Sequence, residues 1–167
     1  ETILISIMYA NNEIGTINPI AEIGRELLKY RKNNKTQWPY FHTDACQATG
    51  TLDLHTERLH VDLMTINGSK MYGPKGVGAL YVRRKNPRVK VTAQMDGGGH
   101  ERGMRSGTLN VPGIVGFGKA CELCRLEMEE DTQRISKLRD KLETELLKVE
   151  EAYVNGSREH RLPHVSR

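Results

Sequence analysis

The order of strand, helix and strand at the start of this chain restricts its fold more than any other feature. Residues 2–8, TILISIM, are mostly apolar and β-branched, which predicts a strand buried on both faces. Asn18-Pro19 is typical of a helix start, and apolar residues then recur at helical spacing from Ile20 to about residue 33. Residues 40–44 predict a second strand. A βαβ unit of this kind favours an α/β fold with a mostly parallel sheet.

The remaining elements continue this pattern. Segments 62–66 and 77–82 predict two further strands, separated by the loop NGSKMYGPKG. A long helical pattern runs from Val111 to about Val149, with a break expected near residues 129–132. The last residues, HRLPHVSR, predict the beginning of another strand. Because the chain opens on an apparent interior strand and stops in another, we expect it to be a fragment of a longer protein.

Composition excludes several classes of protein. With 37% hydrophobic and 28% charged residues among 167, the chain is typical of a folded domain and too apolar for a disordered one. Its apolar runs are shorter than the roughly 18 residues of a membrane span, and its start lacks a basic secretory region. Three cysteines, an odd number, favour a reducing compartment, so we expect the cytoplasm, or alternatively the mitochondrial matrix. The basic run at 83–90 lacks a recognition motif, so we expect no direct nucleic acid binding.

Four polar side chains follow predicted strands and are candidates for a ligand site. They are Asn12, Asp44, Gln47 and Lys70. Ligands of open α/β sheets gather at the carboxyl ends of strands. An acid and a lysine there suit pyridoxal phosphate, whose aldehyde forms a Schiff base with lysine and whose ring nitrogen pairs with an acid. Each residue alone also has a plain interpretation, since strand-end acids often cap turns and loop lysines are often surface residues.

Two lysines compete for the Schiff base, and spacing alone does not choose between them. Lys75 lies between Pro74 and Gly76, in a tight turn where an exposed side chain is expected. Lys70 follows Asn67-Gly68-Ser69, whose donors suit a phosphate close to the lysine. We therefore favour Lys70.

Four long segments together carry a family resemblance. The stretches MYANNEIGTINPI, HTDACQATG, DLMTINGSKMYGPKGVGALYVRR and GGGHERGMRSGTLNVPGIVGFG resemble consecutive blocks of the cysteine desulfurase family, which is class-V aminotransferase-like. The similarity covers nearly the whole chain, apart from a few extra residues near 35–39. It implies the three-layer α/β/α large domain of fold-type I pyridoxal-phosphate enzymes. Residues 1–110 would form part of this cofactor-binding domain, and 111–167 the long connecting helix and the start of the small C-terminal domain.

The resemblance implies roles for the four candidates. Lys70 is similar to the family's Schiff-base lysine, and Asp44 to the acid that pairs with the pyridine nitrogen. Gln47 and Asn12 would hydrogen-bond the side of the cofactor that carries the phenolic oxygen.

Further residues would hold the phosphate. Asn67, Gly68 and Ser69 correspond to the family's phosphate-binding loop, although the family usually has Ser at the first position and His at the third. Both replacements keep a hydrogen-bond donor. Thr108 is similar to a threonine that reaches the phosphate bound by the other subunit, which implies a homodimer.

The family converts L-cysteine to L-alanine and leaves the sulfur as a persulfide on an enzyme cysteine, for iron-sulfur cluster assembly or tRNA thiolation. The sulfur passes to an acceptor or scaffold protein. In the family the catalytic cysteine belongs to a mobile loop beyond Arg167, so we expect the fragment alone to be inactive. A selenocysteine lyase and a non-catalytic dimerisation or scaffold-binding module of the same fold are the alternatives.

The chain's own cysteines are weak candidates for that chemistry. Cys46 lies two residues after Asp44, where the family usually has a small residue. Cys121 and Cys124 have CxxC spacing within the predicted long helix, and a single such pair is weak evidence for a metal. We therefore predict no metal site.

Overall fold

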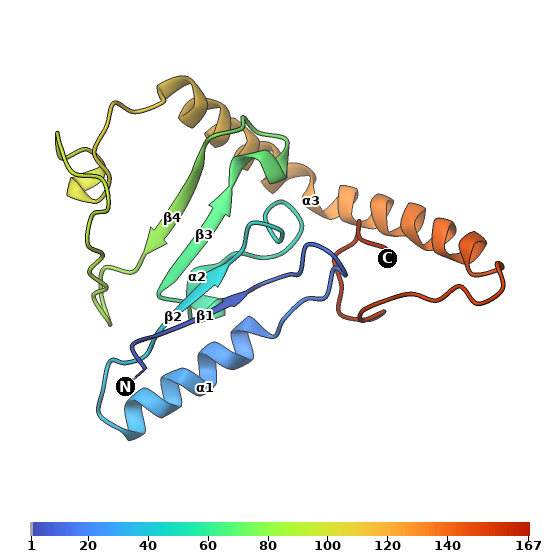
Figure 1. Ribbon diagram of the computed structural model, residues 1–167, viewed down its shortest axis with the longest axis horizontal. Coiled ribbons are helices and arrows are strands. Elements are labelled where there is room, and N and C mark those ends of the chain that lie inside the picture. Colours follow the sequence, from blue (N-terminus) through green and yellow to red (C-terminus); the bar gives the residue numbers. More distant parts are fainter. Residues whose placement is uncertain (1) are drawn as a thin grey trace.

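A four-stranded mixed sheet forms the centre of the protein, which is known from a computed structural model that describes residues 2–167 (Figure 1). The strands are β1 (Leu4–Met8), β2 (Tyr40–Asp44), β3 (Leu63–Asn67) and β4 (Gly78–Val82), and they lie side by side in this order. The first three strands are parallel, and β4 is antiparallel to β3. The α/β fold with a mostly parallel sheet is confirmed, and the four predicted strands agree with the observed bounds to within two residues.

The helices pack on one face of this sheet. They are α1 (Ile20–Asn33), α2 (Thr56–Leu59) and α3 (Val111–Leu146), with 3-10 turns η1 (Gly68–Met71) and η2 (Glu101–Gly103). Ile20 of α1, Phe41 of β2 and Met64 of β3 belong to one buried cluster, and Phe117 of α3 belongs to a second. Ile66 of β3 packs against both clusters, so α1 and the first half of α3 cover the same face of the sheet.

The buried carboxylate of Asp62 connects α1 to the sheet near the amino ends of the parallel strands. Asp62, which is 1% exposed, accepts a hydrogen bond from the backbone N–H of Phe41 at 2.8 Å and from Arg31 of α1 at 2.5 Å. Arg83 lies 3.4 Å from the second oxygen of Asp62. Because a buried charge is costly unless it is paired, this ion cluster fixes how α1 meets the sheet.

The C-terminal segment returns to the loop after β1. Thr16 and Arg161 form an isolated antiparallel bridge, and Leu162 N donates to Gly15 O at 2.8 Å. Arg161 also pairs with Glu143 of α3. The final residues therefore connect α3 to the loop that carries Asn12.

Three details of the sequence interpretation are wrong. The strand β1 is not buried on both faces, because Leu4 is 47% exposed and Ser6 is exposed. The helix α3 is continuous through residues 129–132, where a break was expected, because nothing in EEDT interrupts helical hydrogen bonding. The end of the chain forms a bridge at Arg161 and not a strand. The short helix α2 was not predicted.

The domain division at residue 110 remains a prediction, and Glu1 lies outside the described residues. The division at residue 110 coincides with the start of α3, where the Asn110 side chain accepts a hydrogen bond from Gly113 N at 3.1 Å.

None of the helices within residues 2–167 combines the length and apolar character needed to cross a membrane.

Candidate functional site

The carboxyl ends of the three parallel strands lie at one edge of the sheet, where β3 extends two residues beyond β1 and β2. Met8 of β1 pairs with Asp44 of β2, and Asp44 pairs with Thr65 of β3. The loops that follow these strands therefore begin side by side, and they carry Asn12, Asp44 and Lys70. These loops thus lie together at the edge of the sheet where ligands of α/β proteins usually bind.

The carboxylate of Asp44 is exposed at this edge and is oriented by the turn that follows it. The backbone N–H of Cys46 donates to Asp44 Oδ1 at 2.9 Å. Burial raises the pKa of the Cys46 thiol to about 11, and a hydrogen bond to Asp44 and the charge of Asp44 add to this effect. The thiol of Cys46 is therefore neutral at physiological pH.

The charge of the Lys70 ammonium group also acts on this thiol. It opposes the effect of Asp44 and lowers the pKa of Cys46. Asp44 at the end of β2 and Lys70 in η1 thus influence the pKa of Cys46 in opposite directions. Lys70 is exposed in η1, directly after β3.

His164 is a further titratable residue that the sequence did not reveal as part of this region. Desolvation and the positive charge of Lys70 both lower the pKa of His164. The bridge between Thr16 and Arg161 carries the C-terminal segment to this edge of the sheet. Because this pairing is formed between distant parts of the chain, no local sequence signal indicates it.

Asn67 and Ser69 are bound to one another in the turn. Asn67 Oδ1 accepts from the Ser69 backbone N–H at 3.0 Å and from the Ser69 hydroxyl at 2.9 Å. Gly68 is buried between them, and a Cβ there would lie 3.0 Å from Phe117 of α3 and 3.0 Å from the carbonyl oxygen of Val77. The tight packing at Gly68 therefore fixes the turn that presents Lys70.

The other predicted residues are less closely gathered. Asn12 is exposed in the turn after β1, and Gln47 is half-buried in the turn after β2. Thr108 is exposed in the segment between η2 and α3, which Figure 1 shows beyond β4, at the opposite edge of the sheet from β1. The site of Asp44 and Lys70 is thus not completed by Thr108 of the same chain.

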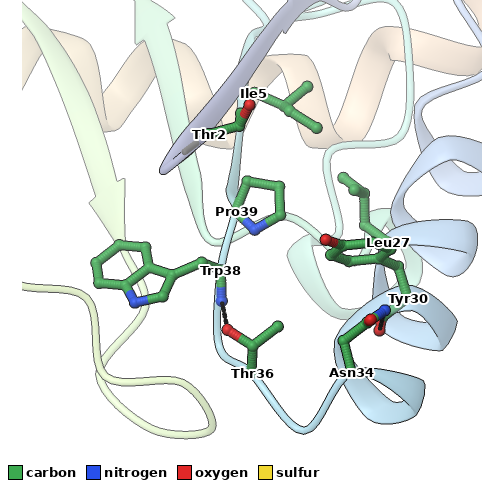
Figure 2. Close-up of a pocket in the computed structure, with 8 residues that line it drawn as sticks. All are labelled: Thr2, Ile5, Leu27, Tyr30, Asn34, Thr36, Trp38 and Pro39. Carbon is green, nitrogen blue, oxygen red and sulfur yellow. Dashed lines mark hydrogen bonds between the residues drawn. The ribbon is translucent and has the colours of Figure 1, made fainter.

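A cavity of about 600 Å³ lies at the other end of the strands (Figure 2). Leu27 and Tyr30 of α1 line it together with Trp38 and Pro39. Thr36 holds the chain at Trp38, since its hydroxyl accepts from the Trp38 backbone N–H at 3.1 Å. The lining carries no charged side chain and none of the predicted site residues, so this cavity does not suit a phosphate.

Comparison with known proteins identifies the family. The model of the aminotransferase class-V family matches residues 1–166. The chain belongs to this family. A similar curated protein, cysteine desulfurase IscS of Anaeromyxobacter sp. (strain K), is 55% identical over 164 residues, which are 98% of this chain and 39% of that protein. The chain therefore spans about two fifths of the length of the curated relatives it matches.

Two solved structures share the fold. The NifS-like protein from Rickettsia africae ESF-5 matches with a TM-score of 0.85 and 36% identity, over 96% of this chain and 42% of that one. The structure titled "SspA in complex with cysteine" matches with a TM-score of 0.62 and 41% identity, over 72% of this chain and 33% of that one. The fold-type I assignment and the resemblance to cysteine desulfurases are thus confirmed.

Class-V aminotransferases and cysteine desulfurases depend on pyridoxal phosphate, and the residues of this site fit that cofactor. An exposed amine at Lys70 suits the aldehyde, and the oriented carboxylate of Asp44 suits a protonated ring nitrogen. The amide groups of Asn12 and Gln47 add hydrogen-bond donors at the same edge of the sheet.

Proposed function

We propose that this protein is a pyridoxal-phosphate-dependent cysteine desulfurase, which converts L-cysteine to L-alanine and passes the sulfur to an enzyme cysteine as a persulfide. One observation carries the proposal: the strand register places Asp44, at the end of β2, beside β3, which leads directly into the turn that carries Lys70, at the carboxyl edge of a fold-type I sheet. The IscS relatives are named for this activity, and a similar protein has been solved in complex with cysteine.

Each candidate residue has a defined task in this proposal. Lys70 would hold the cofactor's aldehyde carbon through Nζ, and its amine would move a proton at the substrate α-carbon. Asp44 holds the proton on the ring nitrogen. When bound, the cofactor supplies an electron sink for the substrate.

The remaining contacts orient the ring. Asn12 and Gln47 donate to its phenolic side. Asn67, Gly68 and Ser69 would lie toward the phosphate. The Ser69 hydroxyl already donates to Asn67 Oδ1, so the donors left for the phosphate are the Asn67 amide nitrogen and groups of the turn that carries Lys70. Thr108 reaches the phosphate of the other subunit in a homodimer.

In this proposal, none of the three cysteines of this chain supplies the thiolate that accepts the sulfur. Burial raises the pKa of Cys46, Cys121 and Cys124 alike, so each is a neutral thiol at physiological pH. The thiolate is the nucleophile that attacks the substrate sulfur, breaking its bond to carbon. We therefore expect no desulfuration by residues 1–167 alone.

The wider role follows from the same proposal. The persulfide sulfur would pass to an acceptor or scaffold protein for iron-sulfur cluster assembly or tRNA thiolation, in the cytoplasm or alternatively the mitochondrial matrix. Selenocysteine lyase activity is the nearest alternative, because the substrate differs by one atom.

Reconstitution with pyridoxal phosphate tests the proposal. The protein is expected to bind one cofactor per chain, with the visible absorption band of a lysine-bound cofactor. Lys70→Ala is expected to lose the band, whereas Lys75→Ala keeps it and is the matched control from the same loop. A band that survives in Lys70→Ala, or is lost only in Lys75→Ala, contradicts the assignment of Lys70.

Product analysis separates the activities. No turnover is expected from residues 1–167 alone, so alanine and sulfide formed from L-cysteine with a reductant, in the presence of the segment that supplies the sulfur-accepting thiolate, support the desulfurase. Turnover of L-selenocysteine alone favours the lyase. A protein that binds no cofactor and turns over neither substrate is the non-catalytic module.

A further inference from the structure

The thiols of Cys121 and Cys124 both contact Met71 beneath the turn that carries Lys70, outside the proposed cofactor site. The Sγ of Cys121 lies 3.7 Å from the Sδ of Met71, and the Sγ of Cys124 lies 4.0 Å from the Met71 carbonyl oxygen. Both cysteines project from one face of α3, because residues three apart are neighbours on a helix. Met71 belongs to η1 and directly follows Lys70.

The site formed by Met71, Cys121 and Cys124 is partly buried. Met71 is 6% exposed, and both cysteines are half-buried. Gly50 closes one side, since a Cβ there would lie only 3.2 Å from Cys124 Sγ. The cysteines are free thiols. Glu127 and Asp131, one and two turns further along α3, act on Cys124 only by their charge.

The geometry points to a binding site for a soft monovalent metal ion, Cu(I), formed by the thiols of Cys121 and Cys124 and the thioether of Met71. Thiolate and thioether ligands select Cu(I) among biological metals. Metal–thiolate bonds of about 2.3 Å around a three-coordinate ion place sulfur atoms about 4 Å apart, close to the separation of Cys121 and Met71. Each thiol releases its proton to solvent as it binds.

The donor set also argues against zinc. Structural zinc requires four ligands drawn from Cys, His and carboxylates. Within residues 2–167, no three such side chains gather as a metal site. The thioether of Met71 is the donor that the CxxC spacing alone did not reveal, and it suits a softer ion with fewer ligands.

Occupation of this site would tie η1 to α3 through metal–sulfur bonds. Since Met71 follows Lys70, the ion would hold the turn that presents the lysine. The metal site stands independently of the proposed enzymatic activity, because it uses different side chains.

Competition with a chromogenic Cu(I) chelator tests the site, using the purified, reduced protein under anaerobic conditions with ascorbate. We expect one equivalent of Cu(I) per chain, with affinity lowered at least tenfold in Cys121→Ser and in Cys124→Ser. Met71→Leu should lower it less, because two thiolates remain. Cys46→Ser is the matched control and should bind as the unaltered protein does.

Several outcomes overturn the inference. One is binding by the unaltered protein no tighter than by a Cys121→Ser/Cys124→Ser double variant, with circular dichroism showing that both are folded. Others are an equal loss in Cys46→Ser, and Zn²⁺ binding as tight as Cu(I). X-ray absorption gives a second readout: three sulfur neighbours around copper are expected, and two in Met71→Leu. An unchanged count in Met71→Leu removes the thioether from the site.

Discussion

Arg161 and Glu143 form a two-bonded ion pair that joins the C-terminal segment to helix α3. Arg161 Nη2 lies 2.7 Å from Glu143 Oε2, and Nη1 bonds to the other carboxylate oxygen. Each side chain is only 7% exposed. Because Arg161 also bridges to Thr16, this pair holds the C-terminal segment against the loop that carries Asn12.

Removing one partner of this pair is expected to destabilise the protein strongly. Arg161→Leu leaves the Glu143 carboxylate buried without a countercharge, which costs about 3–5 kcal/mol in comparable cases. Urea unfolding followed by circular dichroism measures the change. Arg158→Leu, an exposed arginine three residues earlier, serves as the control and should alter stability by less than about 0.5 kcal/mol. Equal effects of the two changes would contradict the buried pairing.

The same pair predicts a pH dependence. Hydrogen bonding from Arg161 is the main cause that lowers the pKa of Glu143 from 4.5 to about 2. A depressed pKa in the folded state contributes stability that is complete above pH 4.5 and is lost as the pH falls toward 2. The difference in unfolding free energy between the unaltered protein and Glu143→Gln should therefore shrink from pH 5 to pH 3. A difference that stays constant over this range would contradict the shifted pKa.

The buried Asp62 gives a second stability prediction. Asp62→Asn removes the charge that balances Arg31 and is expected to cost about 3–5 kcal/mol, because Arg31 is then buried without its partner. Asp53→Asn is the matched control, since Asp53 pairs with Arg58 at 2.7 Å on the surface. Such exposed pairs contribute about 0–1 kcal/mol. Thermal unfolding of both variants measures the contrast, and a loss below about 1 kcal/mol in Asp62→Asn would be inconsistent with a paired interior charge.

Local patterns predicted the elements of this fold, and distant contacts explain what they missed. The apolar segments and the Asn18-Pro19 start were sufficient for β1, β2 and α1, because hydrophobic periodicity and helix-start residues act over a few residues. The exposure of Leu4 was not visible, since burial depends on what packs against the strand. Short α2 lacks the length over which periodicity can be detected.

In the candidate site, too, local sequence predicted some features, and others depend on distant contacts. Asp44 and Lys70 were predicted as site residues because each lies at the end of a strand or directly after one and resembles a family motif, and their roles stay predictions. The contact between Met71 and Cys121 and the effect of Lys70 on the pKa of His164 arise between segments far apart in the chain. No periodicity or spacing in the sequence encodes such contacts, so only the folded structure reveals them.

Close packing between α1 and α2 predicts the effect of an added methyl group. A Cβ at Gly24 would lie 2.5 Å from the carbonyl oxygen of Leu59 and 2.8 Å from His60 Cβ. Alanine is favoured over glycine in helices by about 1 kcal/mol, but overpacking against backbone costs about 1–3 kcal/mol. Gly24→Ala should therefore lower stability.

A second glycine supplies the control for this change. A Cβ at Gly118 of α3 would meet nothing within 4 Å beyond its own helix, so Gly118→Ala should gain up to about 1 kcal/mol from helix propensity. Chemical denaturation of the two variants measures the opposite signs. A stabilised Gly24→Ala would show that α2 moves away at little cost.

The reactivity of Cys46 reports the positions of Asp44 and Lys70 directly. With a pKa of about 11, this thiol should react with iodoacetamide at pH 8 about 20-fold more slowly than an ordinary thiol, because the loss of thiolate outweighs its greater nucleophilicity. The cofactor-free protein is alkylated, and the Cys46 peptide is followed by mass spectrometry. Between pH 7 and pH 9 the rate should rise about tenfold per pH unit.

Two variants separate the electrostatic contributions to this rate. Asp44→Asn removes a negative charge that raises the pKa of Cys46, so alkylation should accelerate. Lys70→Met removes a positive charge that lowers this pKa, so alkylation should slow. Lys75→Met is the matched control and should leave the rate unchanged. If neither Asp44→Asn nor Lys70→Met alters the rate, the two groups do not lie around the Cys46 thiol, and a single ring bound between them loses its structural basis.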